Sequence, residues 1–207
     1  MTPTLYVVRH GHTDDNANSG PSAEESIRGH RDVPLNDEGI SSARSVAKVL
    51  ARHPISHIYS SDLSRATDTA DAISDTKGAP VTETKKLRDW HMGIHEGELV
   101  KKVLPRLLDH CLHCTSTPVE GGEAFQVYVD RLLPFMRTVL STLEKDQTTA
   151  AVVTHGRNTR LIKGWVEKGT DGTAYKDEYL KRKDPPVQPG EVMVLQHIGG
   201  KWRVKER

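Results

Sequence analysis

The sequence predicts an α/β fold: a three-layer sandwich with a mainly parallel central sheet, helices on both faces and an antiparallel edge strand. Short apolar segments rich in β-branched residues alternate along the chain with longer segments that have helical spacing. Two of the short segments, residues 5–8 and 150–153, are apolar throughout, which is typical of strands buried on both faces. The last segment, 191–204, contains Gly199-Gly200 and predicts a β-hairpin that supplies the antiparallel strand.

Helix and strand signals then follow in order. Asn36 or Asp37 is the expected N-cap of the first helix, and Ser61-Asp62 the expected cap of the second. Strands are expected at about 5–8, 55–60, 81–84, 150–154, 191–197 and 201–204, and helices at about 37–53, 61–77, 99–112, 123–143 and 155–168. Long polar loops are expected at 11–36 and 170–190, and an ordered loop without a clean period at 87–97.

Composition limits the classes of protein to which this chain could belong. Its 207 residues fit a single domain over residues 1–207, with about 98–120 as a cap insertion over the pocket. The net charge of +1 gives no global basic field for nucleic acid, and no apolar run is long enough to span a membrane. Because no basic and apolar leader precedes the first strand, we expect a cytoplasmic protein. The only two cysteines exclude a disulfide scaffold.

A His-Gly pair follows the carboxyl end of two of the predicted strands. Arg9-His10-Gly11 follows the first apolar run, and His155-Gly156 follows a similar run near the end of the chain. Because ligands bind at the carboxyl edge of an open α/β sheet, these side chains are expected to face one crevice. The alternative for either segment alone is a solvated loop, but structural need gives no reason for both histidines.

Arg65 adds a third cationic group. It lies in the first turn of a predicted helix, where free backbone N–H groups and the helix dipole also favour anions. Together with Arg9 and the two histidines it describes a site for a dianion, because the guanidinium fork binds phosphate oxygens in pairs. The alternative is an ordinary surface salt bridge with Asp62 or Asp68.

Histidine in such a site can also react. Neutral imidazole is a nucleophile near pH 7, and attack on phosphorus would give a phosphohistidine. The leaving alkoxide then needs a proton from a nearby acid. The loop at 87–97 offers Asp89 and Glu96.

Five segments of the chain, in family order, resemble those of the histidine phosphatase superfamily, in its phosphoglycerate-mutase-like branch. The matching positions are Arg9, His10, Gly11, Thr13 and Asn16; Gly29, Asp32, Pro34, Leu35, Asn36 and Gly39; Ser61 through Ala70 with Arg65; Leu87, Gly93, Glu96 and Gly97; and finally His155-Gly156. They span nearly the whole chain.

The resemblance implies a role for each matched residue. His10 would be the phosphorylated nucleophile, and Arg9, Arg65 and His155 would clamp the phosphoryl group. Asp89 would be the general acid and then the base that activates water. Substrate-binding positions would be Gly11, Thr13, Asn16, Gly29 and Gly156, with hydrogen bonds to phosphate from Asn16 and the Gly11 backbone. No metal and no other cofactor is implied, since side chains supply the positive charge.

The sequence departs from the family pattern at three positions. The expected acid is Glu but position 89 is Asp, which leaves Glu96 as an alternative acid. Arg157 stands where a second Gly is usual, and His12 replaces a common Glu; we assign His12 no role. A separate group, His110, Cys111, His113 and Cys114, is superficially like a metal cluster, but ordinary helix residues are the preferred interpretation.

The predicted function is hydrolysis of a small phosphate ester by a metal-independent phosphomonoesterase through a phosphohistidine on His10. The nearest alternative is a cofactor-dependent phosphoglycerate mutase. The family's mutases carry an arginine pair after the fourth segment, and none occurs between residues 97 and 121. A non-catalytic phosphate-binding domain is the alternative from another class. The sequence does not identify the phosphate ester. It also leaves the oligomeric state open, and a homo-oligomer is one of the alternatives.

Overall fold

The computed structural model describes residues 2–16, 25–169 and 187–205, so most of the predicted loop at 170–190 lies outside the described residues. One six-stranded sheet has the order β3-β2-β4-β1-β5-β6. The strands are β1 (Thr4–Arg9), β2 (Ile55–Ser60), β3 (Val81–Glu83), β4 (Thr149–Thr154), β5 (Val192–Ile198) and β6 (Lys201–Val204). The four strands from β3 to β1 are parallel. The predicted fold class is therefore confirmed.

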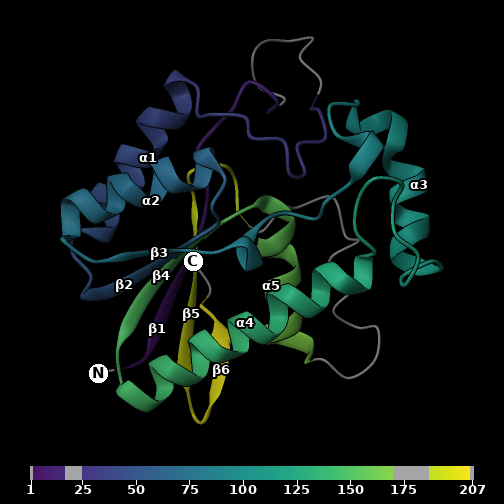
Figure 1. Cartoon of the computed structure of the whole chain (residues 1–207). Coiled ribbons are helices and arrows are strands. Elements are labelled where there is room, and N and C mark those ends of the chain that lie inside the picture. Colours follow the sequence, from purple (N-terminus) through teal and green to yellow (C-terminus); the bar gives the residue numbers. More distant parts are fainter. Residues whose placement is uncertain (1, 17–24, 170–186, 206–207) are drawn as a thin grey trace.

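Helices cover both faces of this sheet (Figure 1). They are α1 (Asp37–Leu50), α2 (Ser64–Lys77), α3 (Val100–Leu112), α4 (Phe125–Asp146) and α5 (Gly156–Lys168). Two short 3-10 helices, η1 (Lys85–Leu87) and η2 (Gly93–His95), lie at the start of the predicted ordered loop and within it. α1 and α2 lie together on one face, α4 and α5 lie on the other, and α3 stands apart from the sheet. The predicted cap segment includes α3.

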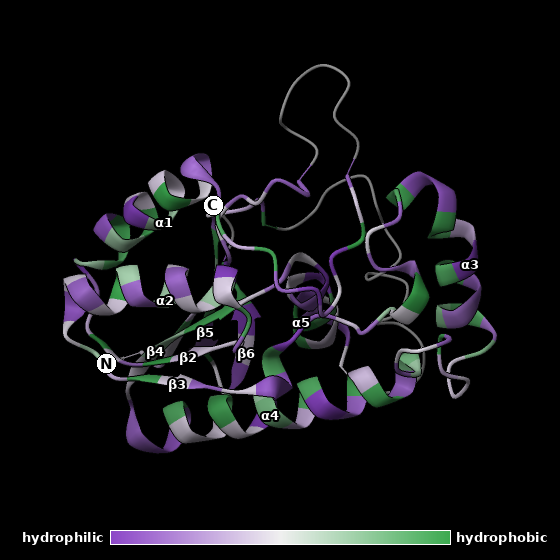
Figure 2. Ribbon diagram, turned by 45° about the horizontal axis from the view of Figure 1, so that its top comes forward, coloured by the Kyte–Doolittle hydropathy of each residue, from purple (hydrophilic) through white to green (hydrophobic). Residues whose placement is uncertain are grey.

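The apolar runs form two cores because neighbouring residues of a strand point to opposite faces. Leu5 and Val7 of β1 belong to the larger core with α4 and α5, whereas Tyr6 and Val8 belong to the smaller core with α1 and α2. Figure 2 shows the matching character of the helices, each banded with hydrophobic and hydrophilic residues. Burial on both faces thus explains the unbroken apolar sequence.

Of the two predicted helix N-caps, one is confirmed and one is wrong. Asn36 is the N-cap of α1, and its side chain accepts a hydrogen bond from the Gly39 N–H at 2.9 Å. The predicted cap at Ser61-Asp62 is wrong, because α2 begins at Ser64 after an N-cap at Leu63 that gives no side-chain hydrogen bond. Asp62 is instead bound by Arg88, and Ser61 is used in the site described below.

The register of the central strands places the functional segments together. β1 and β4 are parallel neighbours, and Arg9 pairs with Thr154 at their carboxyl ends. The His10 N–H continues this ladder by donating to the Thr154 carbonyl oxygen at 2.9 Å. His10 and His155 therefore leave the sheet side by side at one edge.

The carboxyl-terminal hairpin completes the sheet. β5 is antiparallel to β1 and β6 is antiparallel to β5, so the hairpin adds two strands beyond β1, with β6 at the edge. Among the described residues, no helix combines the length and the apolar character needed to cross a membrane.

Candidate active site

The two histidines face each other at the carboxyl edge of the sheet. Their ring centroids are 5.2 Å apart with an edge-on inclination of 61°, and each residue is only 1% exposed. The His155 Nε2 lies 2.9 Å from the Ser61 hydroxyl oxygen. Its Nδ1 is buried and has no partner among the described residues. The structure thus brings the two separate His-Gly segments into one site.

A backbone contact holds the ring of His10 in one tautomer. Its Nδ1 lies 2.7 Å from the Gly11 carbonyl oxygen, and a carbonyl can only accept, so Nδ1 carries the proton. Nε2 of the neutral ring is then unprotonated. Burial, followed by the positive charges of Arg65, Arg28 and Arg9, lowers the pKa of His10 well below its ordinary 6.5. His10 is therefore neutral at physiological pH.

Arg9 and Arg65 bring buried positive charge to the site. They are 7% and 0% exposed, and burial is the main cause that lowers the pKa of each to about 10, which still leaves both charged near pH 7. The Nε of each guanidinium is buried without a partner among the described residues. A buried N–H donor without a partner is costly, and an anion between these groups would satisfy both.

Arg65 is held by carbonyl groups of the long loop before α1. Its Nη1 donates to the Arg31 carbonyl oxygen at 2.8 Å, and its Nη2 donates to the Gly29 carbonyl oxygen at 3.0 Å. Gly29 has a φ of +51°, and a Cβ there would lie 2.1 Å from the Glu96 Oε1. The predicted alternative for Arg65, a surface salt bridge, is wrong, because the side chain is fully buried and points into the site.

The remaining predicted phosphate ligands have partners within the protein. The Gly11 N–H donates to the Thr69 hydroxyl at 3.1 Å, so in this structure it is not offered to a ligand. The Asn16 Oδ1 accepts from both the N–H and the hydroxyl of Thr13, at 2.9 and 3.0 Å, which shapes the turn after β1. At Gly156 a Cβ would lie 3.0 Å from the Arg9 guanidinium carbon, so the glycine leaves room for that group.

The two candidate acids lie in different environments. Asp89 is 3% exposed; its Oδ2 accepts from Arg157 at 2.9 Å and its Oδ1 from the Trp90 N–H at 2.9 Å. Its negative charge also acts to raise the pKa values of Arg9 and Arg65.

Glu96 instead ties two loops together. Its Oε1 accepts from the His30 N–H at 2.8 Å and the Met92 N–H at 3.0 Å. A carboxylate that satisfies two backbone donors has a structural role, so the geometry favours Asp89 over Glu96 as the acid.

Two buried residues of the site escape the sequence patterns. Arg28 is 5% exposed, donates to the Asp15 carbonyl oxygen at 2.9 Å, and its charge helps to lower the pKa of both site histidines. It directly precedes Gly29, the first residue of a matched segment, and this proximity is the signal that could have revealed it. Asn158, 0% exposed, donates to the carbonyl oxygens of Leu87 and Arg88. An Asn within a helix gives no such signal.

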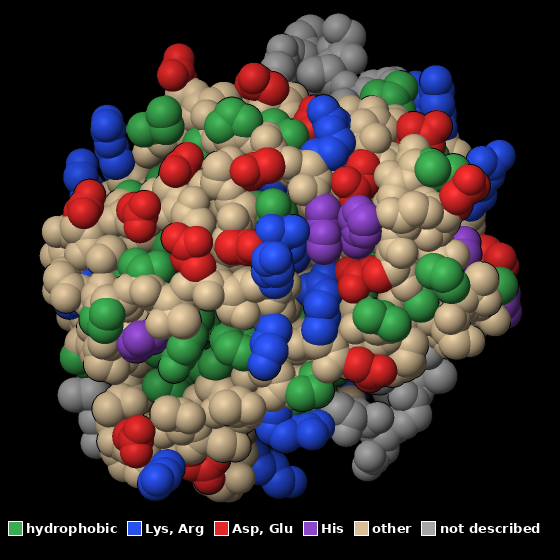
Figure 3. All heavy atoms as spheres, viewed as in Figure 1, with side chains coloured by type: hydrophobic (Ala, Val, Ile, Leu, Met, Phe, Trp, Pro, Cys, Tyr) green, Lys and Arg blue, Asp and Glu red, His purple; other side chains and the backbone are tan. Residues whose placement is uncertain are grey.

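Other polar groups singled out in the sequence lie outside the site. His12 lies 3.5 Å from a carboxylate oxygen of Glu38, and His113 bonds Asp109. Within the described ranges, no three His, Cys, Asp or Glu side chains gather as metal ligands. On the face drawn in Figure 3, Lys and Arg side chains form a column with Asp and Glu on both sides, as on a solvated surface.

The fold and the site define a class of α/β protein in which two buried histidines and buried arginines gather at the carboxyl edge of the sheet. A family model described as the histidine phosphatase superfamily (branch 1) matches residues 5–206. The chain belongs to this superfamily, and the resemblance seen in the sequence is confirmed.

Three relatives are similar to this chain over part of its length. A probable phosphoglycerate mutase of Serratia proteamaculans is 30% identical over 156 residues, which cover 73% of this chain and 69% of that protein. The phosphoglycerate mutase-like protein 4 of Arabidopsis thaliana is 35% identical over 160 residues, which cover 73% of this chain and 66% of that protein. A glucosyl-3-phosphoglycerate phosphatase of Mycolicibacterium vanbaalenii is 41% identical over 93 residues, which cover 45% of this chain and 39% of that protein.

Solved structures agree on the fold. A mycobacterial glucosyl-3-phosphoglycerate phosphatase matches with a TM-score of 0.74 at 22% identity, covering 99% of this chain and 98% of that one. A phosphoglycerate mutase from Thermus thermophilus matches with a TM-score of 0.65 at 27% identity, covering 99% and 97%. Phosphatase and mutase names both occur among the relatives, which supports an enzyme of one of these two kinds.

Proposed function

We propose that this protein is a metal-independent phosphomonoesterase that hydrolyses a small phosphate ester through a phosphohistidine on His10. The single observation that carries the proposal is the state of the His10 ring. It is neutral, its Nδ1–H is held by the Gly11 carbonyl, and its Nε2 keeps a free lone pair beside Arg9 and Arg65. A fixed neutral imidazole next to phosphate-binding cations fits nucleophilic attack on phosphorus.

In the first step the His10 Nε2 attacks phosphorus and the bond between phosphorus and the ester oxygen breaks. Arg9, Arg65 and His155 stabilise the charge that develops on the phosphoryl oxygens. The leaving oxygen takes a proton from the carboxyl group of Asp89 and departs as an alcohol. The phosphoryl group is now bound to Nε2.

In the second step water attacks the phosphohistidine. The Asp89 carboxylate takes a proton from this water, the bond between Nε2 and phosphorus breaks, and inorganic phosphate leaves. His10 is again neutral and Asp89 again carries its proton. Because Arg157 binds the Asp89 Oδ2 in this structure, we expect this guanidinium to move from that oxygen when the acid is in use.

A mutase is the second candidate, and the names of two relatives favour it. A mutase must return the phosphoryl group to a second hydroxyl of its substrate and keep water out meanwhile. The sequence between residues 97 and 121 has no arginine pair of the kind carried by the family's mutases. This supports transfer to water.

The test is release of inorganic phosphate from p-nitrophenyl phosphate in the presence of a chelator, for the wild type and His10→Ala. The expected result is chelator-resistant turnover that is lost in the variant, together with a protein mass increase of one phosphoryl group after rapid acid-free quenching. His113→Ala is the matched control, because that imidazole is 71% exposed and bonds Asp109. Turnover that survives in His10→Ala would exclude the phosphohistidine.

Two further outcomes would replace the proposal. Interconversion of 2- and 3-phosphoglycerate without phosphate release would establish the mutase. Phosphate binding without any turnover, on esters of small alcohols and phenols alike, would establish a binding domain.

A further inference from the structure

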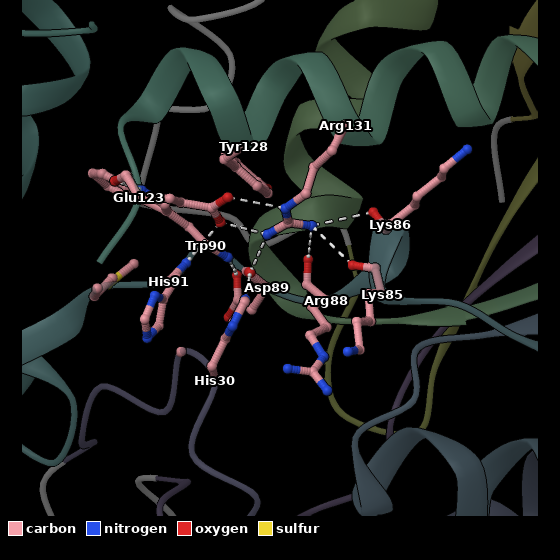
Figure 4. Close-up of polar contacts among 12 residues, drawn as sticks. His30, Lys85, Lys86, Arg88, Asp89, Trp90, His91, Glu123, Tyr128 and Arg131 are labelled. Atoms are coloured by element: carbon pink, nitrogen blue, oxygen red, sulfur yellow. Dashed lines mark hydrogen bonds and ion pairs between the residues drawn. The ribbon is translucent and has the colours of Figure 1, made fainter. Parts of the chain in front are cut away.

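Arg131 reaches from α4 to the loop that carries Asp89 (Figure 4). Its Nη1 donates to the carbonyl oxygens of Arg88 at 2.8 Å and Lys86 at 3.2 Å, and its Nη2 donates to the carbonyl oxygen of Asp89. The same guanidinium makes a double contact with the Glu123 carboxylate, at 3.1 Å from Nε and 2.6 Å from Nη2. One side chain thus binds several backbone carbonyl groups of the loop.

The Asp89 carbonyl oxygen has a second donor on its other side. His30 lies 2.9 Å from it through Nε2, which must be protonated because the partner is a carbonyl. The His30 ring stacks on His91, with centroids 4.5 Å apart and planes inclined by 25° (Figure 4). Two donors from distant parts of the chain therefore hold one backbone oxygen of the candidate acid.

Glu123 extends the same support to the residues after Asp89. Its Oε1 accepts from the His91 N–H at 2.9 Å, and its backbone carbonyl accepts from the Trp90 indole N–H at 2.9 Å. The Trp90 ring packs edge-on against Phe125, with centroids 5.3 Å apart. Arg131 neutralises this carboxylate, which is 15% exposed, and so allows it to serve as an acceptor within the fold.

The carboxylate and the backbone carbonyl of Asp89 thus have different partners. Its carboxylate faces Arg157 and the cationic pocket, and its backbone carbonyl faces Arg131 and His30. A single methylene separates the carboxyl group from Cα, so the Asp side chain has little freedom to compensate for a shift of the backbone. Where the acid is Asp, its distance to the leaving oxygen is set by the loop.

We infer that Arg131 is a positioning residue: it holds the loop 85–91 so that the Asp89 carboxyl group reaches the leaving oxygen of the substrate. The inference rests on the proposed function, in which Asp89 donates that proton. Arg131 itself does not touch the reacting atoms. Its removal would therefore impair proton donation more than binding of the phosphoryl group.

Substrates with different leaving groups distinguish a residue that positions the acid from one that only stabilises the fold. A phenolate leaves poorly without a proton, whereas a nitrophenolate leaves readily as the anion. Phenyl phosphate and p-nitrophenyl phosphate have nearly the same shape, so they make similar demands on the pocket. A misplaced acid slows the first ester much more than the second, whereas partial unfolding reduces both equally.

The experiment compares kcat/KM for these two esters in the wild type, Arg131→Met and Arg131→Lys. For Arg131→Met we expect a loss of about 10- to 100-fold with phenyl phosphate and about threefold or less with p-nitrophenyl phosphate. Arg131→Lys keeps the charge but not the fork, so a smaller loss with the same preference is expected.

Arg137→Met is the matched control, since Arg137 lies exposed on the same helix; its ratio of the two kcat/KM values should equal that of the wild type. Equal losses for both esters, or no loss in either Arg131 variant, would overturn the positioning role. If Arg131→Met does not fold, Arg131→Lys decides by the same ratio. Failure of the wild type to hydrolyse either ester would overturn the proposed function itself. This outcome is distinct from failure of the positioning role, because the wild type is assayed before any variant.

Discussion

Acidification should destabilise this protein through its two buried site histidines. His10 and His155 are each 1% exposed, and burial is the main cause that lowers both pKa values well below the ordinary 6.5. The neighbouring Arg65 acts in the same direction on both rings. In the unfolded chain the same imidazoles would titrate at their ordinary pKa.

The sign and size follow from proton linkage. Below pH 6.5 the unfolded state binds a proton at each histidine and the native state does not, so the free energy of unfolding falls as the pH falls. Once the unfolded imidazole is protonated, each histidine contributes a slope of about 1.4 kcal/mol per pH unit. Integrated over the titration of the unfolded chain from pH 6.5 to 5.0, the pair would remove about 3 kcal/mol.

Urea unfolding at intervals between pH 7.5 and 5.0 measures this effect. Phosphate buffers must be avoided, because an anion bound to the native site would add stability of its own. The control is the double variant with His10→Gln and His155→Gln, in which all other titrating groups remain. Its curve of unfolding free energy against pH should be flatter by about 3 kcal/mol over this range. Parallel curves for the wild type and the double variant would refute the reasoning.

Three further predictions concern the loops around the site. Gly29→Ala should cost about 2 kcal/mol or more of unfolding free energy, because the residue has a φ of +51° and its Cβ would meet Glu96; an unchanged urea midpoint would contradict this. Arg65→Met leaves the carbonyls of Gly29 and Arg31 without donors, so a loss of about 2 kcal/mol is expected, and inorganic phosphate should no longer raise the melting temperature. Asp89→Asn should lower kcat/KM for phenyl phosphate by about 10²- to 10⁴-fold. Glu96→Gln should lower the melting temperature but keep kcat/KM of the folded enzyme within about fivefold of the wild-type value. A larger loss of kcat/KM in Glu96→Gln than in Asp89→Asn would make Glu96 the acid.

Local sequence was sufficient for most secondary structure because the strands are buried on both faces. Their apolar runs stand out against polar loops, so β1, β2 and β4 lie within one residue of their predicted bounds. The start of α2 was mispredicted for a tertiary reason. Asp62 and Ser61 are typical capping residues, but Arg88 and His155 bind their side chains from elsewhere in the chain.

The site could be predicted only in part. The two His-Gly segments and Arg65 carry short patterns, and the structure brings them together at one edge of the sheet. Arg28 and Arg131 carry no such pattern, because a single arginine in a loop or helix is most often a solvated residue. Their importance depends on the carbonyl and carboxylate groups that surround them in three dimensions.

The sequence by itself determined the fold class, the family and the candidate nucleophile, because these depend on periodicity and on short ordered segments. Only the tertiary structure decided the tautomer of His10, the partners of the two candidate acids and the support of Asp89 by Arg131 and His30. These properties arise from groups that are distant in the chain and adjacent in space. Burial makes each of their hydrogen bonds and charges count for more than it would in water, and burial is a property of the folded chain.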